Sequence, residues 1–554
     1  MLWLLAKRAT LFCGFAGATV LALDHQHVID LTCYPAIRAA RTGFVVASIV
    51  GDYKWTLWNI DKNTPMYASA KSQVHSRSAK RLLNLCWRNR GTYVKVGQHL
   101  GGMDYLLPEE YTNELKILHS NAPTSTVKEI EEVIKEDLNV TSIGDLFSTF
   151  ETKPLGTASL AQVHKATLKS DGSCVAVKVQ HPHVRDLADK DMNMMDGALQ
   201  CIPYFFPEFD LLWLGEETRR NLPVELDFTV EAANSERVAS NLKKFDWVAI
   251  PKIYKKYSTS RVLVMEFMNG GQVNDMEYFK DNSIDCNHVS KLLGKLYSEM
   301  IFIHGFVHCD PHPGNIFVRW KQDESTFYKQ KKLQLVLLDH GLYRELSDNF
   351  RYHYANLWQS IINTDVRGIE THCRACGSGE MYPLLATIVT GRAWKVVGSD
   401  GIKEVKFTQD EDNEIRSNAG SFLPHISQVL NRVPREMLLV LKANDHLRGL
   451  EHLYGVRGHS SGFLDMSRCC LRALHDFNAQ KLQEKQSKWE KFLSLMWCHL
   501  ILYTGLLKIT AFEWFLWFQE KTSCDLTLHN IFSGSTNQST TVFNKNTFVV
   551  QNSS

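Results

Sequence analysis

Alternating apolar and polar residues near the middle of the chain predict a β-hairpin. Its two strands, SLAQVHKATL (159–168) and CVAVKVQ (174–180), are rich in β-branched residues, and the turn sequence KSDGS separates them. A further strand pattern, SRVLVMEFMNGGQV (260–273), runs into a pair of glycines. Such an ending predicts a hinge between two lobes.

Apolar residues at helical spacing dominate the rest of the middle region. This periodicity predicts helices in NLPVELDFTVEAANSERVASNL (221–242) and in VSKLLGKLYSEMIFIHGFVH (289–308), which leads directly into VHCDPHPGNIFV (307–318). The stretch LQLVLLDHGLY (333–343) predicts a strand with Asp339 at its end. Three later stretches predict a helical C-terminal part: 357–365, 381–394 and 423–455.

The two ends of the chain differ from this body. Residues 1–23 carry Lys7 and Arg8, no acid, and then a largely apolar run, which is typical of a mitochondrial targeting segment, a short membrane anchor or a secretory signal. The scattered cysteines argue against the secretory alternative. The apolar helix expected over 481–523 either lies on a membrane or packs inside the body. The polar segment 524–554 is expected to be disordered.

Composition and charge exclude several classes of protein. With 554 residues, 44% of them hydrophobic, the chain is globular and long enough for more than one domain. Its formal net charge of +2 gives no overall attraction to nucleic acid, so no nucleic-acid partner is expected. The 13 cysteines follow no disulfide framework, which indicates a reducing compartment. Cys373 and Cys376 lack the second pair that a tetrahedral zinc site requires.

Several charged and polar residues follow one another along the chain in the order that is typical of a kinase-like phosphoryl-transfer site. Lys178 lies on an apolar strand, Glu231 on the helix after it, and Asp339 at the end of a later strand. Asp310 and Asn315 stand five positions apart on the loop between them. In such a site Lys178 neutralises phosphates, and Asp310 accepts or orients the proton of an attacking hydroxyl. Asn315 and Asp339 supply the hard oxygen ligands that Mg²⁺ prefers.

The same loop also suggests a metal site of another kind. His308, Cys309 and His312 are all potential zinc ligands. However, Pro311 and Pro313 forbid the helical spacing that places two histidines on one metal. We therefore expect a catalytic loop in which His308 packs as a support, with zinc as the alternative.

Taken together, these motifs resemble the UbiB family of atypical kinases, also called the ABC1 or AarF-domain family. The resemblance covers residues from roughly 70 to roughly 475, and several stretches are similar to one branch of the family in particular. It rests on KVGQ (95–98), LPEEY (107–111), ASLAQVHKA (158–166), VAVKVQHP (175–182), ELDFTVEAAN (225–234), HCDPHPGN (308–315) and LLDHGLY (337–343).

The resemblance implies an α+β fold that is protein-kinase-like and two-lobed, with an N-terminal helical extension and a large helical C-terminal lobe. It also implies ATP and Mg²⁺ as cofactors. We accordingly expect a targeting or anchor segment over 1–23, a linker or helical region over 24–70, the extension over 71–150, an N-lobe over 151–270, a C-lobe over 271–480, an apolar helical segment over 481–523 and a disordered tail over 524–554.

By the same resemblance, an alanine-rich loop replaces the glycine-rich phosphate loop of ordinary kinases. Here the loop reads GTAS and departs from the all-alanine pattern at its first two positions. ATP contacts are expected from Lys178, paired with Glu231, and from the loop and hinge residues Gly156, Thr157, Ala158, Ser159, Glu266 and Met268.

The resemblance implies that the KVGQ motif regulates the nucleotide site, because the extension that carries the motif folds over that site in this family. Its members are Lys95, Gly97 and Gln98, and Lys95 is expected to reach the acidic pair Glu225 and Asp227. A buried lysine needs such an anion, since an unpaired buried charge is costly. Three later basic residues look like a family segment and are expected to be solvated or to pack within the lobe, with substrate contact as the alternative: Arg435, Lys442 and Arg448.

The resemblance implies a kinase or ATPase that acts in mitochondrial lipid, coenzyme Q or inner-membrane (cristae) homeostasis. The expected partners are a nucleotide, a small-molecule or lipid substrate and the mitochondrial membrane, on the inner-membrane, intermembrane or matrix side. Protein substrates are disfavoured because the extension would occupy the peptide cleft. One alternative is a nucleotide-binding, pseudokinase-like scaffold that acts through protein interactions. An ordinary protein kinase is disfavoured because a G-x-G-x-x-G loop is missing and DHG replaces DFG.

Overall fold

Most of the chain is described by the computed structural model. The described residues are 34–62, 64–102, 107–120, 122–206, 212–322, 331–390, 394, 397, 432–455, 461–483 and 488–532. The expected targeting or anchor segment 1–23 and residues 533–554 of the expected tail lie outside these ranges.

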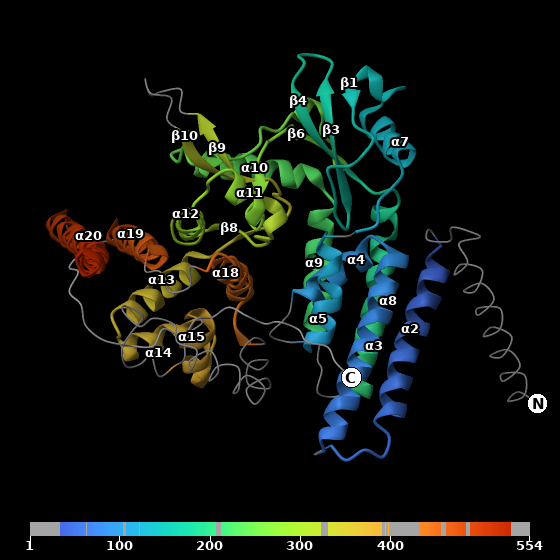
Figure 1. The fold of residues 1–554 in the computed structure, drawn as a ribbon, viewed down its shortest axis with the longest axis horizontal. Coiled ribbons are helices and arrows are strands. Elements are labelled where there is room, and N and C mark those ends of the chain that lie inside the picture. Colours follow the sequence, from blue (N-terminus) through green and yellow to red (C-terminus); the bar gives the residue numbers. More distant parts are fainter. Residues whose placement is uncertain are drawn as a thin grey trace, which may run out of the picture.

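A five-stranded antiparallel sheet forms the N-lobe (Figure 1). Its strands run in the order β1–β3–β4–β6, and β2 also pairs with β3. The predicted hairpin is confirmed as β3 and β4, in which Lys178 lies opposite Val163. The strands are β1 (Phe147–Phe150), β2 (Gly156–Thr157), β3 (Ala161–Leu168), β4 (Cys174–Gln180) and β6 (Val262–Glu266).

The alternation of side chains along β4 decides which helix each residue of that strand meets. Val175, Val177 and Val179 pack with helix α7 (Val127–Leu138) on one face of the sheet. Ala176, and Lys178 two positions on, point to the opposite face, which helix α10 (Phe228–Asn241) covers. The hydrophobic pattern of the strand therefore directs its single lysine toward α10.

The N-terminal extension is a helical bundle beside the N-lobe (Figure 1). Its apolar core joins residues of α3, α4 and α8, including Leu83, Val94 and Met192. A buried ion pair between Arg38 and Asp191 ties α2 to α8. Its helices are α2 (Pro35–Thr56), α3 (Pro65–Asn89), α4 (Thr92–Gly101), α5 (Glu109–Leu115), α6 (Ile117–Ser120), α8 (Val184–Phe205) and α9 (Leu212–Glu225).

These contacts correct the expected boundaries of the extension. The bundle begins at Pro35 instead of residue 71, and it includes α8 and α9 from the range assigned to the N-lobe. Conversely, β1 is a strand of the N-lobe sheet and α7 packs against that sheet. The boundary expected at residue 150 would therefore separate both of them from the N-lobe. The physical reason is that apolar faces define a domain by packing together, whether or not their segments are contiguous in the sequence.

The C-lobe surrounds the largest hydrophobic core. It contains a four-stranded sheet in the order β5–β10–β9–β7 and the pair β8–β11. Its strands are β5 (Val248–Ala249), β7 (Gly271–Gln272), β8 (Phe306–His308), β9 (Ile316–Gln322), β10 (Lys331–Leu337) and β11 (Tyr343–Glu345). Its helices are α11 (Met276–Asp281), α12 (Cys286–Ser298), α13 (Asp348–Ile362), α14 (Val366–Ala375), α15 (Tyr382–Thr390), α18 (Arg435–Leu453) and α19 (Ser461–Gln483).

The helix predicted over 289–308 ends differently from the prediction. Regular α12 gives way to a π-helical turn, η3 (Glu299–His304), and Gly305 then turns the chain at φ 59° into β8. Glu299 in this turn is almost fully buried and pairs with Lys244 at 2.9 Å and with Arg472 of α19 at 3.3 Å. The buried carboxylate of Glu299, balanced by two cations, thus holds α19 against η3.

The long C-terminal helix α20 (Lys488–Phe532) packs beside α19. Its stretch Trp489–Ala511 is long and apolar enough to cross a membrane, and the stretch is not buried in the molecule. The alternative of a buried body helix is therefore wrong. The expected disordered tail also starts too early at residue 524, because α20 continues to Phe532. Extending a formed helix by one residue costs little compared with starting one.

Candidate active site

Lys178, Glu231 and Asp339 meet where the two lobes face each other. The Lys178 ammonium donates to both oxygens of Glu231, at 2.7 and 2.8 Å, and to Oδ2 of Asp339 at 3.2 Å. Glu231 is buried on the first turn of α10, whereas Asp339 is about one-third exposed. Three residues far apart in sequence thus form one ion cluster.

The backbone around Asp339 fixes the orientation of its carboxylate. The N–H of Gly341 donates to Asp339 Oδ1 at 2.8 Å, and the N–H of His340 donates to Glu231 Oε1 at 3.4 Å. Asn234 of α10 donates to the His340 carbonyl at 3.0 Å. A Cβ at position 341 would lie 3.2 Å from Asp339 Oδ1, so glycine allows the close approach.

Burial and neighbouring charges act in opposite directions on the pKa values of this cluster. Burial by itself would lower the pKa of Lys178, but Asp339 and Glu231 together raise it above its ordinary value. Burial would raise the pKa of Asp339, yet Lys178 brings it down to about 2. Burial raises the pKa of Glu231, and Lys178 opposes that shift. The Lys178 ammonium therefore lies between Glu231 and the ionised Asp339.

Asp310 lies on the loop that follows β8, and a lysine from a distant helix neutralises it. The Nζ atom of Lys442, on α18, is 3.1 Å from Asp310 Oδ1. Burial would raise the pKa of Asp310, but Lys442 and Lys95 hold it well below its ordinary value. Lys442 therefore pairs with a specific residue of the proposed catalytic loop, which the expectation of a solvated or lobe-packing charge did not foresee. Arg448 does pack, because it donates to two carbonyls at the end of α15.

The rest of the loop supports Asp310 and Asn315. Asn315 donates through Nδ2 to the Asp310 carbonyl at 3.2 Å. His308 is buried, and the Tyr297 hydroxyl lies 3.1 Å from its Nδ1. Burial lowers the pKa of His308, so the ring is neutral at pH 7. Cys309 is buried and its thiol contacts the Val307 carbonyl.

A zinc site is not found at this loop. Within the described ranges, no group of three or more His, Cys, Asp or Glu side chains is arranged to hold a metal ion by itself. His312 is instead used to cap the turn Pro313–Asn315, because its Nδ1 accepts from the Gly314 N–H at 3.2 Å. Cys373 and Cys376 are free thiols buried in the C-lobe core.

The predicted magnesium ligands are Asp339 and Asn315, and their chemistry fits such an ion. The Asn315 amide nitrogen is turned toward the loop backbone, which leaves the side-chain oxygen as the available ligand atom. Asp339 stays ionised and partly exposed. A carboxylate and an amide oxygen, completed by phosphate oxygens and water, form the kind of site that Mg²⁺ occupies in phosphoryl-transfer enzymes.

The GTAS residues comprise strand β2 (Gly156–Thr157) and the start of the turn that leads into β3. Gly156 and Thr157 pair with Val163 and Gln162, and the Ala158 N–H donates to the Ala161 carbonyl at 2.8 Å. A Cβ at Gly156 would meet nothing within 4 Å. An alanine side chain would therefore fit at position 156, and lack of space does not explain the glycine. Ser159 is buried beneath the turn.

Glu266 is the last residue of β6, and Met268 follows it at the predicted hinge. The Glu266 carboxylate accepts from the Lys252 N–H at 3.3 Å. Met268 is buried, and its sulfur contacts Arg319 of β9 in the C-lobe at 3.3 Å. The hinge segment therefore contacts strands of both lobes.

The KVGQ residues lie on α4 and partly follow the expectation. Lys95 Nζ is 2.5 Å from Glu225 Oε2, and both side chains are nearly buried. Burial would lower the pKa of Lys95, but Glu225 raises it. Asp227, the other member of the expected acidic pair, instead caps α10 by accepting from the Thr229 N–H at 3.0 Å. A helix start leaves unpaired N–H groups, and an aspartate at this position satisfies one of them.

The remaining motif residues fasten α4 to α6. A Cβ at Gly97 would lie 2.4 Å from Leu118 and 2.9 Å from Cys86, so only glycine allows this approach. Gln98 donates to the Leu118 carbonyl at 3.0 Å. From α6, the His119 ring stacks on His312 of the catalytic loop at a centroid distance of 4.9 Å. The extension is thereby in direct contact with the loop of Asp310.

This arrangement defines a protein-kinase-like fold, with the lysine–glutamate pair in the small lobe and the aspartates in the helical lobe. The model of the ABC1 atypical kinase-like domain matches residues 117–373. AarF domain-containing protein kinase 1 of Gallus gallus is 48% identical over 93% of this chain and 96% of its own, and AarF domain-containing kinase 1 of Drosophila melanogaster is 43% identical over 91% and 98%. The chain therefore belongs to the ABC1, or AarF-domain, family of atypical kinase-like proteins.

These findings confirm the family and the branch that the motifs resembled. Among solved structures, the erythromycin complex of Rv3197 from Mycobacterium tuberculosis aligns with 69% of this chain and 95% of its own, at 18% identity and a TM-score of 0.41. The α+β, kinase-like fold expected from the sequence is likewise confirmed.

Two functional contacts were missed by sequence reasoning. Lys442 was expected to be solvated or to pack within the lobe, although it directly follows the apolar run MLLVL (437–441), which was a signal of a specific partner. His119 carried no signal, because nothing in its neighbourhood indicates that it stacks on a loop almost two hundred residues later.

Proposed function

We propose that the chain is a Mg²⁺-dependent phosphotransferase or ATPase that uses ATP and acts on a small molecule or lipid at a mitochondrial membrane. The observation that best supports this proposal is the position of Lys178 Nζ, which lies within hydrogen-bonding distance of both Glu231 and Asp339. An ordered lysine–glutamate pair beside the metal-binding aspartate is the arrangement that active kinases require.

Each side chain then has a task in phosphoryl transfer. Lys178 would bind phosphate oxygens of ATP, and Asp310 would orient the attacking hydroxyl or water and take up its proton. The charge of Lys442 makes Asp310 a weak base, which is tolerable because a loose transition state depends on positioning more than on base strength. Asp339 and Asn315 would hold Mg²⁺, which neutralises charge on the phosphates when it is bound.

The contact of the extension with the catalytic loop favours a small acceptor over a peptide. His119 of α6 stacks on His312, and Lys95 of α4 contributes to the field at Asp310. This part of the extension lies on the loop along which a peptide would have to be presented. We infer that the acceptor is small or lipid-like, or that water is the acceptor.

Nucleotide binding provides the direct test. We expect Mg²⁺ and ATP together to raise the thermal midpoint of the purified chain. The variant Asp339→Ala should lose this shift, while Lys128→Ala, an exposed lysine on α7, should keep it. An undiminished shift in Asp339→Ala would contradict the metal assignment.

The scaffold alternative is separated from catalysis by a rescue experiment. Asp310→Asn removes the charge of the proposed base and preserves its shape. If cells that lack the protein are restored fully by Asp310→Asn and by Asp339→Asn, the catalytic function is not what those cells need. Fractionation of the full chain, and of a chain lacking residues 1–23, tests the mitochondrial location.

A further inference from the structure

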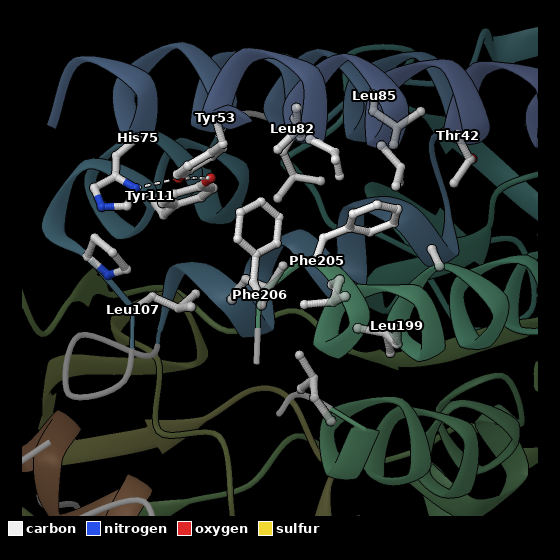
Figure 2. Close-up of a pocket in the computed structure, with 18 of the residues that line it drawn as sticks. Thr42, Tyr53, His75, Leu82, Leu85, Leu107, Tyr111, Leu199, Phe205 and Phe206 are labelled. Carbon is white, nitrogen blue, oxygen red and sulfur yellow. Dashed lines mark hydrogen bonds between the residues drawn. The ribbon is translucent and has the colours of Figure 1, made fainter. Parts of the chain in front are cut away.

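A large apolar cavity lies inside the extension bundle, on the other side of α4 from the kinase site. Its volume is about 780 Å³, and residues of α2, α3, α4, α8 and α9 line it. Figure 2 shows Leu82, Leu85, Leu199, Phe205 and Phe206 directed into this space. Cavities of this size and lining bind apolar ligands of several hundred daltons.

The polar groups inside the cavity are uncharged. The Tyr53 hydroxyl bonds to His75 Nδ1 and lies 3.0 Å from the Tyr111 hydroxyl (Figure 2). Burial lowers the pKa of His75 and raises the pKa values of Tyr53 and Tyr111. An ionised group placed among the leucine and phenylalanine side chains of the interior would lose its hydration, which would be costly.

The mouth of the cavity, in contrast, is cationic. Lys54 and Lys62 are exposed at the end of α2 and in the loop after it, and Lys71 lines the same end from α3. Among the described residues that line the cavity, none is an aspartate or glutamate. Trp58 also lines this end and is 72% exposed, and its neighbour Trp55 is 86% exposed. Lysines and exposed tryptophans together are typical of surfaces that meet anionic lipid headgroups.

We propose that this cavity binds a lipid with an anionic headgroup, whose acyl chain lies among the apolar side chains and whose headgroup meets Lys54, Lys62 and Lys71. The apolar interior matches the chain, and the three lysines supply the charge that the interior lacks. A free fatty acid and an anionic phospholipid share this chemistry, and the experiment below distinguishes them.

Helix α4 connects the lipid cavity to the kinase site. Val96, Gly97 and Leu100 line the cavity, and Lys95 on the same helix reaches Glu225 at 2.5 Å. Because Gly97 leaves no space against Leu118, α4 cannot move toward α6. An acyl chain in the cavity would therefore hold α4, and with it Lys95, in place. This coupling rests on the proposed nucleotide function, whereas lipid binding does not.

Binding is tested on the full chain with the fluorescent fatty acid cis-parinaric acid. We expect saturable binding that Lys54→Glu, Lys62→Glu and Lys71→Glu in one variant weakens roughly tenfold or more, since three cations that attract the headgroup become anions. Lys128→Glu reverses one exposed charge far from the mouth and should bind as the wild type does. Leu82→Trp, which fills the cavity without changing charge, should reduce the number of binding sites.

Competition identifies the source of the ligand. Displacement of the probe by oleate alone indicates a free fatty acid, and displacement by phosphatidylglycerol in phosphatidylcholine vesicles, with plain phosphatidylcholine as control, indicates a phospholipid. Either result supports the proposal. Absence of saturable binding, or equal binding by the triple-lysine variant, Leu82→Trp and the wild type, overturns it.

The coupling has a readout of its own. Amide hydrogen exchange in Thr92–Gly101 should slow when cis-parinaric acid is bound. Unchanged exchange with the probe bound would refute the coupling and leave lipid binding intact. If the wild type binds the probe but shows no response to Mg²⁺ and ATP, the proposed nucleotide function fails while the lipid site stands.

Discussion

Asp310 and Lys442 are 132 positions apart, yet they form an ion pair at the proposed catalytic loop. Ordinary protein kinases have their loop sequence H-R-D-L-x-x-x-N, whereas this loop carries prolines and a histidine between the aspartate and the asparagine. In this chain the cation that pairs with Asp310 is Lys442, which lies outside the loop, on α18. The sequence pattern identified Asp310 because the residues of its motif are neighbours in the chain. It did not identify Lys442, because that residue approaches Asp310 only in the folded structure.

The first residue-scale prediction concerns Lys442. Lys442→Met should lower the rate constant of ATP turnover on the order of 100-fold, because a fixed positive charge is lost where negative charge develops. Lys442→Arg should retain part of the rate. Lys280→Met, at an exposed position of α11, is the matched control. Steady-state ATPase kinetics measure the effect, and an unchanged turnover number in Lys442→Met would remove this residue from the mechanism.

A second residue-scale prediction concerns Gly97. Gly97→Val should reduce the free energy of unfolding by about 1–3 kcal/mol, since its Cβ would overlap buried Leu118 and Cys86. Gly156→Ala adds a Cβ where nothing lies within 4 Å and should leave the stability nearly unchanged. Chemical denaturation of both variants checks the comparison. Equal stability of Gly97→Val and wild type would contradict the packing described.

At the scale of elements, α20 presents apolar side chains to the surroundings along a long helix. Among the described residues, α19 packs beside it, and Lys291 of α12 pairs with Glu513 at 3.7 Å. Leu493, Trp497, Leu500, Ile501 and Leu507 are all more than half exposed. Exposed apolar patches of this extent mark a surface for a membrane or a partner. The sequence predicted an apolar helix here, but periodicity could not tell a lipid-facing helix from a buried one.

The element-scale prediction is that α20 binds membranes. Leu500→Asp combined with Ile501→Asp should reduce co-sedimentation with phosphatidylcholine and phosphatidylglycerol vesicles, because two charges would enter the apolar interface. Thr152→Asp with Ser170→Asp adds two charges at exposed N-lobe positions and should sediment as the wild type does. Equal sedimentation of the α20 variant would assign this surface to another partner.

At the scale of the whole molecule, the extension, the catalytic loop and α18 meet around a group of neutral histidines. Burial lowers the pKa of His119 on α6 to about 4 and that of His446 on α18 to about 4. His99 on α4 and His312 on the loop are shifted in the same direction. Asp310 favours their protonation, and Lys442 opposes it. Three separate parts of the fold therefore depend on these rings staying uncharged.

The whole-molecule prediction is a loss of stability in mild acid. Because the folded-state pKa values lie below the ordinary 6.5, the unfolded chain takes up more protons as the pH falls from about 6.5 to about 4. Each such histidine should cost on the order of 1 kcal/mol between pH 7 and pH 5. Melting curves of His446→Gln should show a weaker pH dependence than the wild type, and exposed His288→Gln should not. Identical pH dependence in all three would contradict the buried cluster.

The sequence by itself determined the order of Lys178, Glu231, Asp310, Asn315 and Asp339, the hairpin and the family. These features depend on local spacing and on the alternation of side chains along a strand, which a linear pattern records. Only the tertiary structure decided that Lys95 pairs with Glu225 while Asp227 caps a helix. It also decided that α8 and α9 complete the extension, and that their packing leaves a cavity behind α4. Such features arise where surfaces distant in sequence meet, and their fit depends on the three-dimensional shape of both partners.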